Sequence, residues 1–113
     1  MSRYSNVTLR SRKPTYRYIR DTDHLPVLWG SGPVPMAKVK LFTPDSSWTW
    51  YIAEFDAETK QAYGLVVGLE TEFGYFNLDE LSKLRGPLGL PVERDLHFTP
   101  TPLSVLSHWR RVD

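Results

Sequence analysis

Three carboxylates are the side chains that could perform acid–base or metal chemistry. Glu93 and Asp95 stand two positions apart, so in an extended strand they would share one face, where Asp45 could join them around a hard cation. The chain has no cysteine, which excludes thiolate catalysis and Cys-ligated zinc, and its three histidines are isolated in sequence. Salt bridges with Arg85 or Arg94 explain Glu93 and Asp95 more simply. We therefore expect no enzyme activity, metal or cofactor, and we keep a carboxylate- or metal-dependent enzyme as an alternative.

Basic side chains gather at the N-terminus. Residues 1–20 contain six Lys or Arg and no acid, and tyrosines are interleaved with them. Guanidinium groups neutralise phosphates and aromatic rings stack on bases, so this arm has the composition of a nucleic-acid-binding segment. It could equally contact a protein, or the acidic residues of its own chain or of a second copy, which would give a homodimer. The residues that would make these contacts are Arg10, Arg12, Lys13, Tyr16, Arg17, Tyr18 and Arg20.

Acidic side chains gather in the middle of the chain, around a strand rich in tryptophan. Residues 45–82 contain eight Asp or Glu against one Lys. Such carboxylates can resemble a phosphate backbone to a basic protein, and Trp and Tyr are common at protein interfaces. A solvated sheet face and a buried tryptophan pair are the simpler interpretations. The candidate partner-binding residues are Asp45, Trp48, Trp50, Glu54, Asp56, Glu70 and Glu72.

The elements that must position these groups fit into a single domain. With 113 residues, 41% hydrophobic and 24% charged, the chain has the size and composition of one soluble domain. Neither a membrane-length apolar run nor a secretory signal is visible, so we expect no membrane partner and a cytoplasmic location. Residues 1–35 are expected to form the basic arm and a Gly/Pro-rich connector, and residues 36–113 an α+β domain.

The strands are predicted from alternating and apolar runs at residues 38–42, 47–55, 63–69 and 73–76, which short polar turns connect. Trp48, Trp50 and Glu54 would share one face of the second strand, and the third strand, almost entirely apolar, would be central. Asn77 is expected to cap a short helix, and Thr101-Pro102 to open a last helix, while residues 92–98 could extend briefly as an edge strand. The predicted fold is α+β, with a four-stranded, mainly antiparallel sheet and two short helices. The loop at residues 86–91 is expected to be ordered, because its two leucines would be poorly hydrated in an exposed loop.

Five runs of the sequence carry a family resemblance: KLFTPD (40–45), WTWY (48–51), GLVVG (64–68), GYF (74–76) and RGPLGLPVERDL (85–96). In this order they resemble an uncharacterised family of small bacterial single-domain proteins, catalogued as a domain of unknown function (number 2958). The resemblance spans about residues 38–106 and does not include the arm. It implies a protein of the kind commonly encoded on plasmids and other mobile elements. It implies little chemistry, since the family has no established activity or site.

The functional expectation is a non-enzymatic binding protein from a bacterial mobile element or phage. Proteins from mobile elements often need to neutralise host nucleases. We therefore expect a protein partner in a nucleic-acid-processing complex, and inhibition of a host defence system of the anti-CRISPR or anti-restriction type. A first alternative is a DNA- or RNA-binding accessory protein that acts through the arm. The second is the carboxylate- or metal-dependent enzyme described above.

Overall fold

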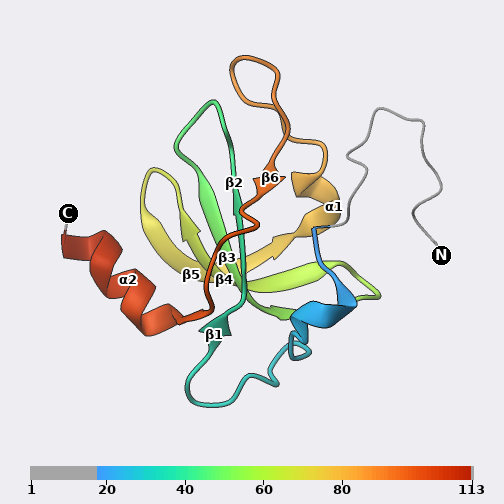
Figure 1. The fold of residues 1–113 in the computed structure, drawn as a ribbon, viewed down its shortest axis with the longest axis vertical. Helices are drawn as coiled ribbons and strands as arrows, with labels where there is room; N and C mark the ends of the chain where they lie inside the picture. Colours follow the sequence, from blue (N-terminus) through green and yellow to red (C-terminus); the bar gives the residue numbers. More distant parts are fainter. Residues whose placement is uncertain (1–17, 113) are drawn as a thin grey trace.

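Residues 18–112 are described in the computed structural model of the chain, which runs through seven strands and two α-helices (Figure 1). The strands are β1 (Met36–Ala37), β2 (Val39–Phe42), β3 (Thr49–Phe55), β4 (Gln61–Val67), β5 (Thr71–Asn77), β6 (Glu93–Arg94) and β7 (Thr101–Pro102). The helices are α1 (Leu78–Leu81) and α2 (Leu103–Val112), and a 3₁₀ turn covers Asp21–Asp23.

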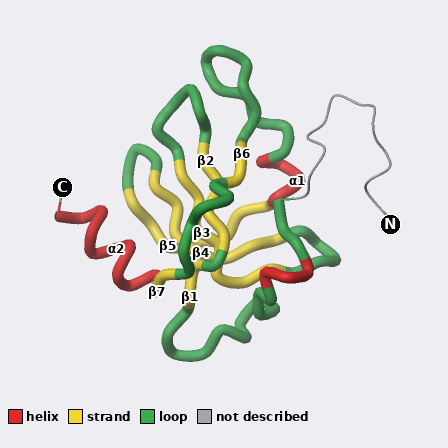
Figure 2. The backbone as a smooth tube through the Cα atoms, viewed as in Figure 1, coloured by secondary structure: helices red, strands yellow, loops and turns green. Residues whose placement is uncertain are grey.

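Five strands form one antiparallel sheet in the order β5-β4-β3-β2-β6 (Figure 2). Short turns join β2 to β5 as consecutive hairpins, as the polar segments between the predicted strands indicated. β6 pairs with the outer side of β2, through Leu41 with Arg94 and Phe42 with Glu93. The prediction of four strands is therefore wrong by one, and β3 is the middle strand in place of the predicted strand at residues 63–69. β6 lies within the brief edge strand expected at residues 92–98, so that expectation is confirmed, although the strand has only two residues.

The first and last strands pair outside the main sheet. Met36 of β1 lies opposite Pro102 of β7, and Ala37 opposite Thr101. The predicted last helix consequently begins at Leu103, whose N–H donates to the Pro35 carbonyl at 2.9 Å. Thr101-Pro102 forms a strand because it pairs with β1. This partner is distant in the sequence and cannot be recognised from the local sequence.

The two faces of the sheet carry separate hydrophobic clusters, since successive side chains of a strand point in opposite directions. The face called here the α1 face holds Trp50 and Ile52, and the α2 face holds Tyr51 and Ala53. Each face is covered by the helix after which it is named, and the two helices lie at opposite sides of the view in Figure 1. The buried residues are Tyr18, Val39, Leu41, Trp50, Ile52, Ala62, Leu78, Leu81 and Val92 on the α1 face, and Ala37, Tyr51, Ala53, Leu65, Leu103 and Leu106 on the α2 face.

A β-bulge in β3 changes the face that the end of this strand presents. The pairing with β4 shifts between Ile52 and Glu54, so β3 contains one extra residue there. Beyond the bulge Glu54 lies opposite Tyr63 on the α2 face, and Phe55 packs against the α1 cluster. The prediction that Glu54 shares a face with the two tryptophans is wrong, because the strict alternation assumed from sequence does not allow for an inserted residue.

The short helix α1 begins where the sequence predicts it. The side-chain oxygen of Asn77 accepts the Glu80 N–H at 3.2 Å, which satisfies one of the free donors of the first turn. The predicted cap is therefore confirmed. Within residues 18–112, neither helix has the length and apolar character needed to span a bilayer.

Residues 18–35 run alongside the sheet and bond to it at several points. The Phe55 N–H donates to the Pro26 carbonyl at 2.9 Å, and the Lys38 ammonium donates to the His24 carbonyl at 2.9 Å. Tyr18 belongs to the α1 cluster. The described part of the arm and connector is therefore packed against residues 36–112.

Candidate protein-binding surface

Glu54 holds the connector against the end of β3. It is 5% exposed and accepts hydrogen bonds from the backbone N–H of Trp29 at 2.8 Å and of Ser31 at 3.1 Å, and a third from the Ser31 hydroxyl. Bonds to a carboxylate are about twice as strong as those between neutral groups. Trp29 has a φ of 70°, a left-handed conformation that is strained for a bulky residue. These three bonds, called here the Glu54 clamp, therefore fix a loop conformation that is unfavourable by itself.

The Glu54 clamp brings Trp29 onto a group of aromatic rings on the α2 face. The Trp29 ring centroid lies 5.6 Å from that of Tyr75, and the Tyr75 centroid lies 5.0 Å from that of its cross-strand partner Tyr63. Phe73 lies two residues from Tyr75 along β5, on the same face of the sheet. Trp29 is 81% exposed, and about half of Phe73 and Tyr75 is exposed. We call these four residues, Trp29, Tyr63, Phe73 and Tyr75, the aromatic surface.

The hydroxyl of Tyr75 on the aromatic surface is kept neutral. Desolvation raises the pKa of Tyr75 above its usual value, and the nearby charge of Glu54 and the neighbouring Tyr63 raise it further. Tyr75 therefore remains a hydrogen-bond donor throughout the physiological range.

The acids predicted to bind a partner have different environments in the structure. Glu70 and Glu72 are exposed, in the turn before β5 and on the α1 face of β5 respectively. Asp56 is half-buried in the β3–β4 turn, where a bond from the Glu58 N–H lowers its pKa. Glu54 is buried in the clamp, so it offers no free surface charge.

The two predicted tryptophans are also divided. Trp50 is 5% exposed and belongs to the α1 cluster, whereas Trp48 is 38% exposed and stacks on Trp50 with ring centroids 6.0 Å apart. A Cβ added at Gly68 would collide with the Trp48 ring, so the ring packs on that glycine. The tryptophan pair is thus mainly structural. Trp29, which was not among the predicted binding residues, is the most exposed of the three tryptophans whose side chains are described.

Asp45 organises the loop at residues 86–91. Its Oδ2 atom accepts the backbone N–H of Leu88 at 2.8 Å and of Leu90 at 3.3 Å, and a Cβ at Gly86 would collide with its Oδ1 atom. The runs at residues 40–45 and 85–96, which both carry the family resemblance, therefore contact each other. The loop is hydrogen-bonded to Asp45, but the reason given for expecting it to be ordered is wrong, because its leucines are not sheltered: Leu88 is 79% exposed.

Two of the three carboxylates considered for catalysis are engaged separately. Asp95 lies 3.6 Å from the Lys40 ammonium and accepts the His97 N–H at 2.9 Å, while Asp45 is bound to its loop. The expected pairing of Asp95 with Arg85 or Arg94 is therefore wrong. Asp95 pairs instead with Lys40 of the neighbouring strand β2. In the part of the chain that the structure describes, no group of three His, Asp or Glu side chains is arranged to hold a metal ion.

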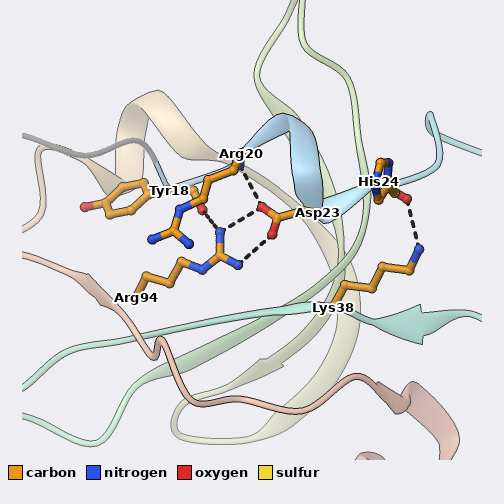
Figure 3. A network of polar contacts seen from close by, with 6 residues as sticks. All are labelled: Tyr18, Arg20, Asp23, His24, Lys38 and Arg94. Carbon is orange, nitrogen blue, oxygen red and sulfur yellow. Dashed lines mark hydrogen bonds and ion pairs between the residues drawn. The ribbon is translucent and has the colours of Figure 1, made fainter. Parts of the chain in front are cut away.

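Figure 3 shows the network that fixes the root of the arm on the domain. Arg94 donates to both carboxylate oxygens of Asp23, at 2.8 and 2.7 Å, and to the Tyr18 carbonyl at 2.8 Å. The Tyr18 hydroxyl donates to the Val92 carbonyl at 2.8 Å, and the Arg20 N–H donates to Asp23 at 2.7 Å. Burial raises the pKa of Asp23, but the hydrogen bonds and charges of Arg94 and Arg20 outweigh it and hold the pKa below its usual range.

This network separates the predicted arm residues. Tyr18 is in the core and its ring is not available for stacking, while Arg20 is exposed. Residues 18–20 are not part of a strand. The other predicted arm residues, Arg10, Arg12, Lys13, Tyr16 and Arg17, lie outside the described residues.

Comparison with known proteins gives a family match over almost the whole chain. A family model described as "Protein of unknown function (DUF2958)" matches residues 7–112. The chain belongs to this family. The DUF2958 match begins within the basic arm, so it extends beyond the expected limits of residues 38–106 at both ends. No curated protein and no solved structure matches the chain.

Proposed function

We propose that this DUF2958 protein is a non-enzymatic protein-binding module from a bacterial mobile element or phage. In this proposal it engages a protein of a nucleic-acid-processing complex and inhibits a host defence system, of the anti-CRISPR or anti-restriction type. The observation that carries the proposal is the aromatic surface, which is exposed and yet held in place by the Glu54 clamp. Trp and Tyr on a rigid support are the residues that dominate binding energy in protein interfaces.

The charge of the segment that contributes most of the aromatic surface favours a protein partner over a nucleic acid. Residues 61–82, which include β4 and β5, contain four acids and no Lys or Arg. A phosphate backbone would be repelled there, whereas the basic nucleic-acid-binding region of a protein would be attracted. Nucleic-acid binding through the basic arm remains the alternative, and its motivation is the six basic residues of residues 1–20.

The test is capture of a partner from host lysate with the full chain and a matched pair of variants. The double variant Trp29→Ala/Tyr75→Ala removes two exposed rings, and Leu96→Ala, also exposed, removes an apolar side chain from a different part of the surface. We expect a stoichiometric complex with a nucleic-acid-processing protein. The double variant should weaken it by about 30-fold or more, the effect of losing a hot spot, and Leu96→Ala should not.

The charge component has its own variant. Glu70→Lys/Glu72→Lys reverses two exposed charges without touching the Glu54 clamp, and it should slow association most strongly at low salt. Retention of the partner by the Trp29→Ala/Tyr75→Ala variant, or the absence of any captured partner, would contradict the proposal. Salt-sensitive capture of nucleic acid in place of protein would favour the alternative.

A further inference from the structure

β5 ends the sheet, and it is long enough to act as a pairing edge. It spans seven residues, and among the described residues no strand lies on its outer side. A strand at an open edge presents a row of backbone donors and acceptors, which proteins usually shorten, bend or cover. The opposite edge of the sheet is formed by β6, which has only two residues.

The ladder between β4 and β5 determines which backbone groups point outward. Hydrogen-bonded and non-hydrogen-bonded pairs alternate in an antiparallel ladder. At its two ends the Leu78 N–H donates to the Lys60 carbonyl, and the Gly68 N–H donates to the Glu70 carbonyl. Counting inward from both ends, the even-numbered residues of β5 face β4. The backbone groups of Phe73 and Tyr75 therefore face outward.

The side chains on both faces of this edge are of types that attract cations. Phe73 and Tyr75 lie on the α2 face beside Trp29, and Glu72 lies on the α1 face. A Cβ at Gly74 would meet nothing within 4 Å, so there is room beside Glu72 on the α1 face. A strand added here would place cations over the aromatic rings on one face and opposite Glu72 on the other.

We propose that β5 is the docking edge for an extended, arginine- or lysine-rich segment of the partner protein, which adds to the sheet as a further strand. The backbone of the segment pairs with Phe73 and Tyr75, and its cationic side chains stack on the aromatic surface. The occupant is chosen by charge complementarity, because residues 61–82 carry acids and no basic residue. This inference rests on the proposed function, and it assigns the mode of binding.

The experiment uses synthetic peptides about six residues long, the usual length of a strand, with arginine alternating with valine. Calorimetric titration of the full chain should show binding. A copy methylated at alternate backbone nitrogens, which keeps its charge and loses the donors of one edge, should bind at least about tenfold more weakly. A glutamate–valine peptide should not bind. Equal binding of the methylated peptide would overturn the proposal, because charge alone would then suffice, and so would a lack of binding by the arginine peptide.

A pair of variants tests the same edge from the side of the protein. Phe73→Ala removes the ring, whereas Phe73→Pro removes the ring and the outward N–H without breaking a bond to β4. The proline variant should bind the arginine peptide about tenfold more weakly than the alanine variant, and circular dichroism checks that both are folded. If the proline variant does not fold, the methylated peptide decides. Equal binding of the peptide by the two folded variants would overturn the proposal. A wild-type dimer that Phe73→Pro dissociates would also overturn it, because the occupant of the edge would then be a second copy of the chain.

Failure here is distinguishable from failure of the proposed function. If partner capture depends on Trp29 and Tyr75 while the methylated peptide binds as well as its parent, strand addition is rejected and the protein-binding function is retained. If capture does not depend on these two rings, the proposed function itself is rejected.

Discussion

A single carboxylate, Glu54, determines where an indole ring stands relative to the sheet. The side chain is buried at the end of β3, and all of its recorded bonds go to Trp29 and Ser31 of the connector. Without these acceptors the connector would keep a strained Trp29 backbone and two N–H donors in need of partners. The exposed ring is thus positioned by a residue that itself has almost no contact with solvent.

Replacement of this residue should loosen the connector and reduce stability. We expect Glu54→Ala to lower the free energy of unfolding by about 2 kcal/mol, since it leaves partly buried N–H groups without an acceptor. Urea denaturation followed by circular dichroism measures the loss. The exposed Glu72→Ala should change stability by less than about 0.5 kcal/mol. Equal losses in the two variants would show that the Glu54 clamp does not stabilise the loop.

The Asp23–Arg94 pair predicts a dependence of stability on pH. Both side chains are 9% exposed, and the pKa of Asp23 lies below its usual value of 3.8. Because the folded-state pKa is the lower one, this stabilisation is complete above the unfolded-state pKa and is lost as the pH falls through the folded-state pKa. Asp23→Asn should therefore cost about 3 kcal/mol at neutral pH, the lower end of the range for a broken buried pair. The difference from the wild type should shrink below about pH 4.

Unfolding titrations of both proteins from neutral to acidic pH test this expectation. Asp95→Asn is the control, because Asp95 is half-buried in a 3.6 Å pair with Lys40 and should contribute less than about 1 kcal/mol. A difference between wild type and Asp23→Asn that stays constant down to acidic pH would contradict the assignment.

Single residues explain why the candidate surface could not be located from sequence. Asn77 could be identified as a cap because its partner is three residues away. Trp50 could be expected in the core from its place in a strand. The Glu54–Trp29 contact joins positions 25 apart and the Asp23–Arg94 contact positions 71 apart. No local pattern connects such positions.

At the scale of elements, the β4–β5 hairpin contains a pair of glycines in unlike environments. Gly64 and Gly74 lie directly opposite each other. A Cβ at Gly64 would collide with the backbone of Tyr51, near the bulge in β3, whereas a Cβ at Gly74 would meet open space. The same residue type therefore allows close backbone approach on the inner strand and leaves a gap on the outer one.

The two glycines should respond oppositely to alanine. Gly64→Ala should destabilise the protein by about 3 kcal/mol, the upper part of the range for overpacking, because backbone must move to admit the methyl group. Gly74→Ala should be neutral or stabilising by up to about 1 kcal/mol, since alanine restricts the unfolded chain. Thermal unfolding of the two variants measures both effects. A large loss for Gly74→Ala would mean that the α1 face of β5 is not open at this position.

The elements were predictable where their signals are local. β2 to β5 and the antiparallel order of their hairpins follow from alternating runs and short turns. The bulge in β3 was not predictable, because residues 50–53 are all apolar and so show no alternation that an inserted residue would interrupt. β6 falls within the expected edge strand at residues 92–98, whereas β7 has two residues and exists only through its pairing with β1. The face of Glu54, and with it the candidate surface, depends on the bulge.

At the scale of the molecule, the N-terminal segment contributes to the core. Tyr18 is 8% exposed on the α1 face, and its hydroxyl bonds to the Val92 carbonyl. Residues 18–31 then reach the end of β3, where the Phe55 N–H and Glu54 bond to them. The segment and the sheet should therefore unfold together.

This cooperativity is tested at its far end. Tyr18→Ala should lower the free energy of unfolding by about 3 kcal/mol, and Tyr18→Phe by about 1 kcal/mol, because the second change removes only a hydroxyl. Amide hydrogen exchange at Phe55 should speed up in proportion to the global loss. Rapid exchange at Phe55 in an otherwise stable protein would show that the segment opens independently of the sheet.

The placement of Trp29 also makes the molecule an optical sensor of its own surface. Of the three tryptophans whose side chains are described, Trp29 is 81% exposed, Trp48 38% and Trp50 5%. An indole in water emits at longer wavelength than one shielded from water, so Trp29 should dominate the red side of the emission of these three. A partner that covers the aromatic surface would shift this emission to the blue and protect it from a soluble quencher. Docking at β5 can therefore be followed on the unlabelled protein.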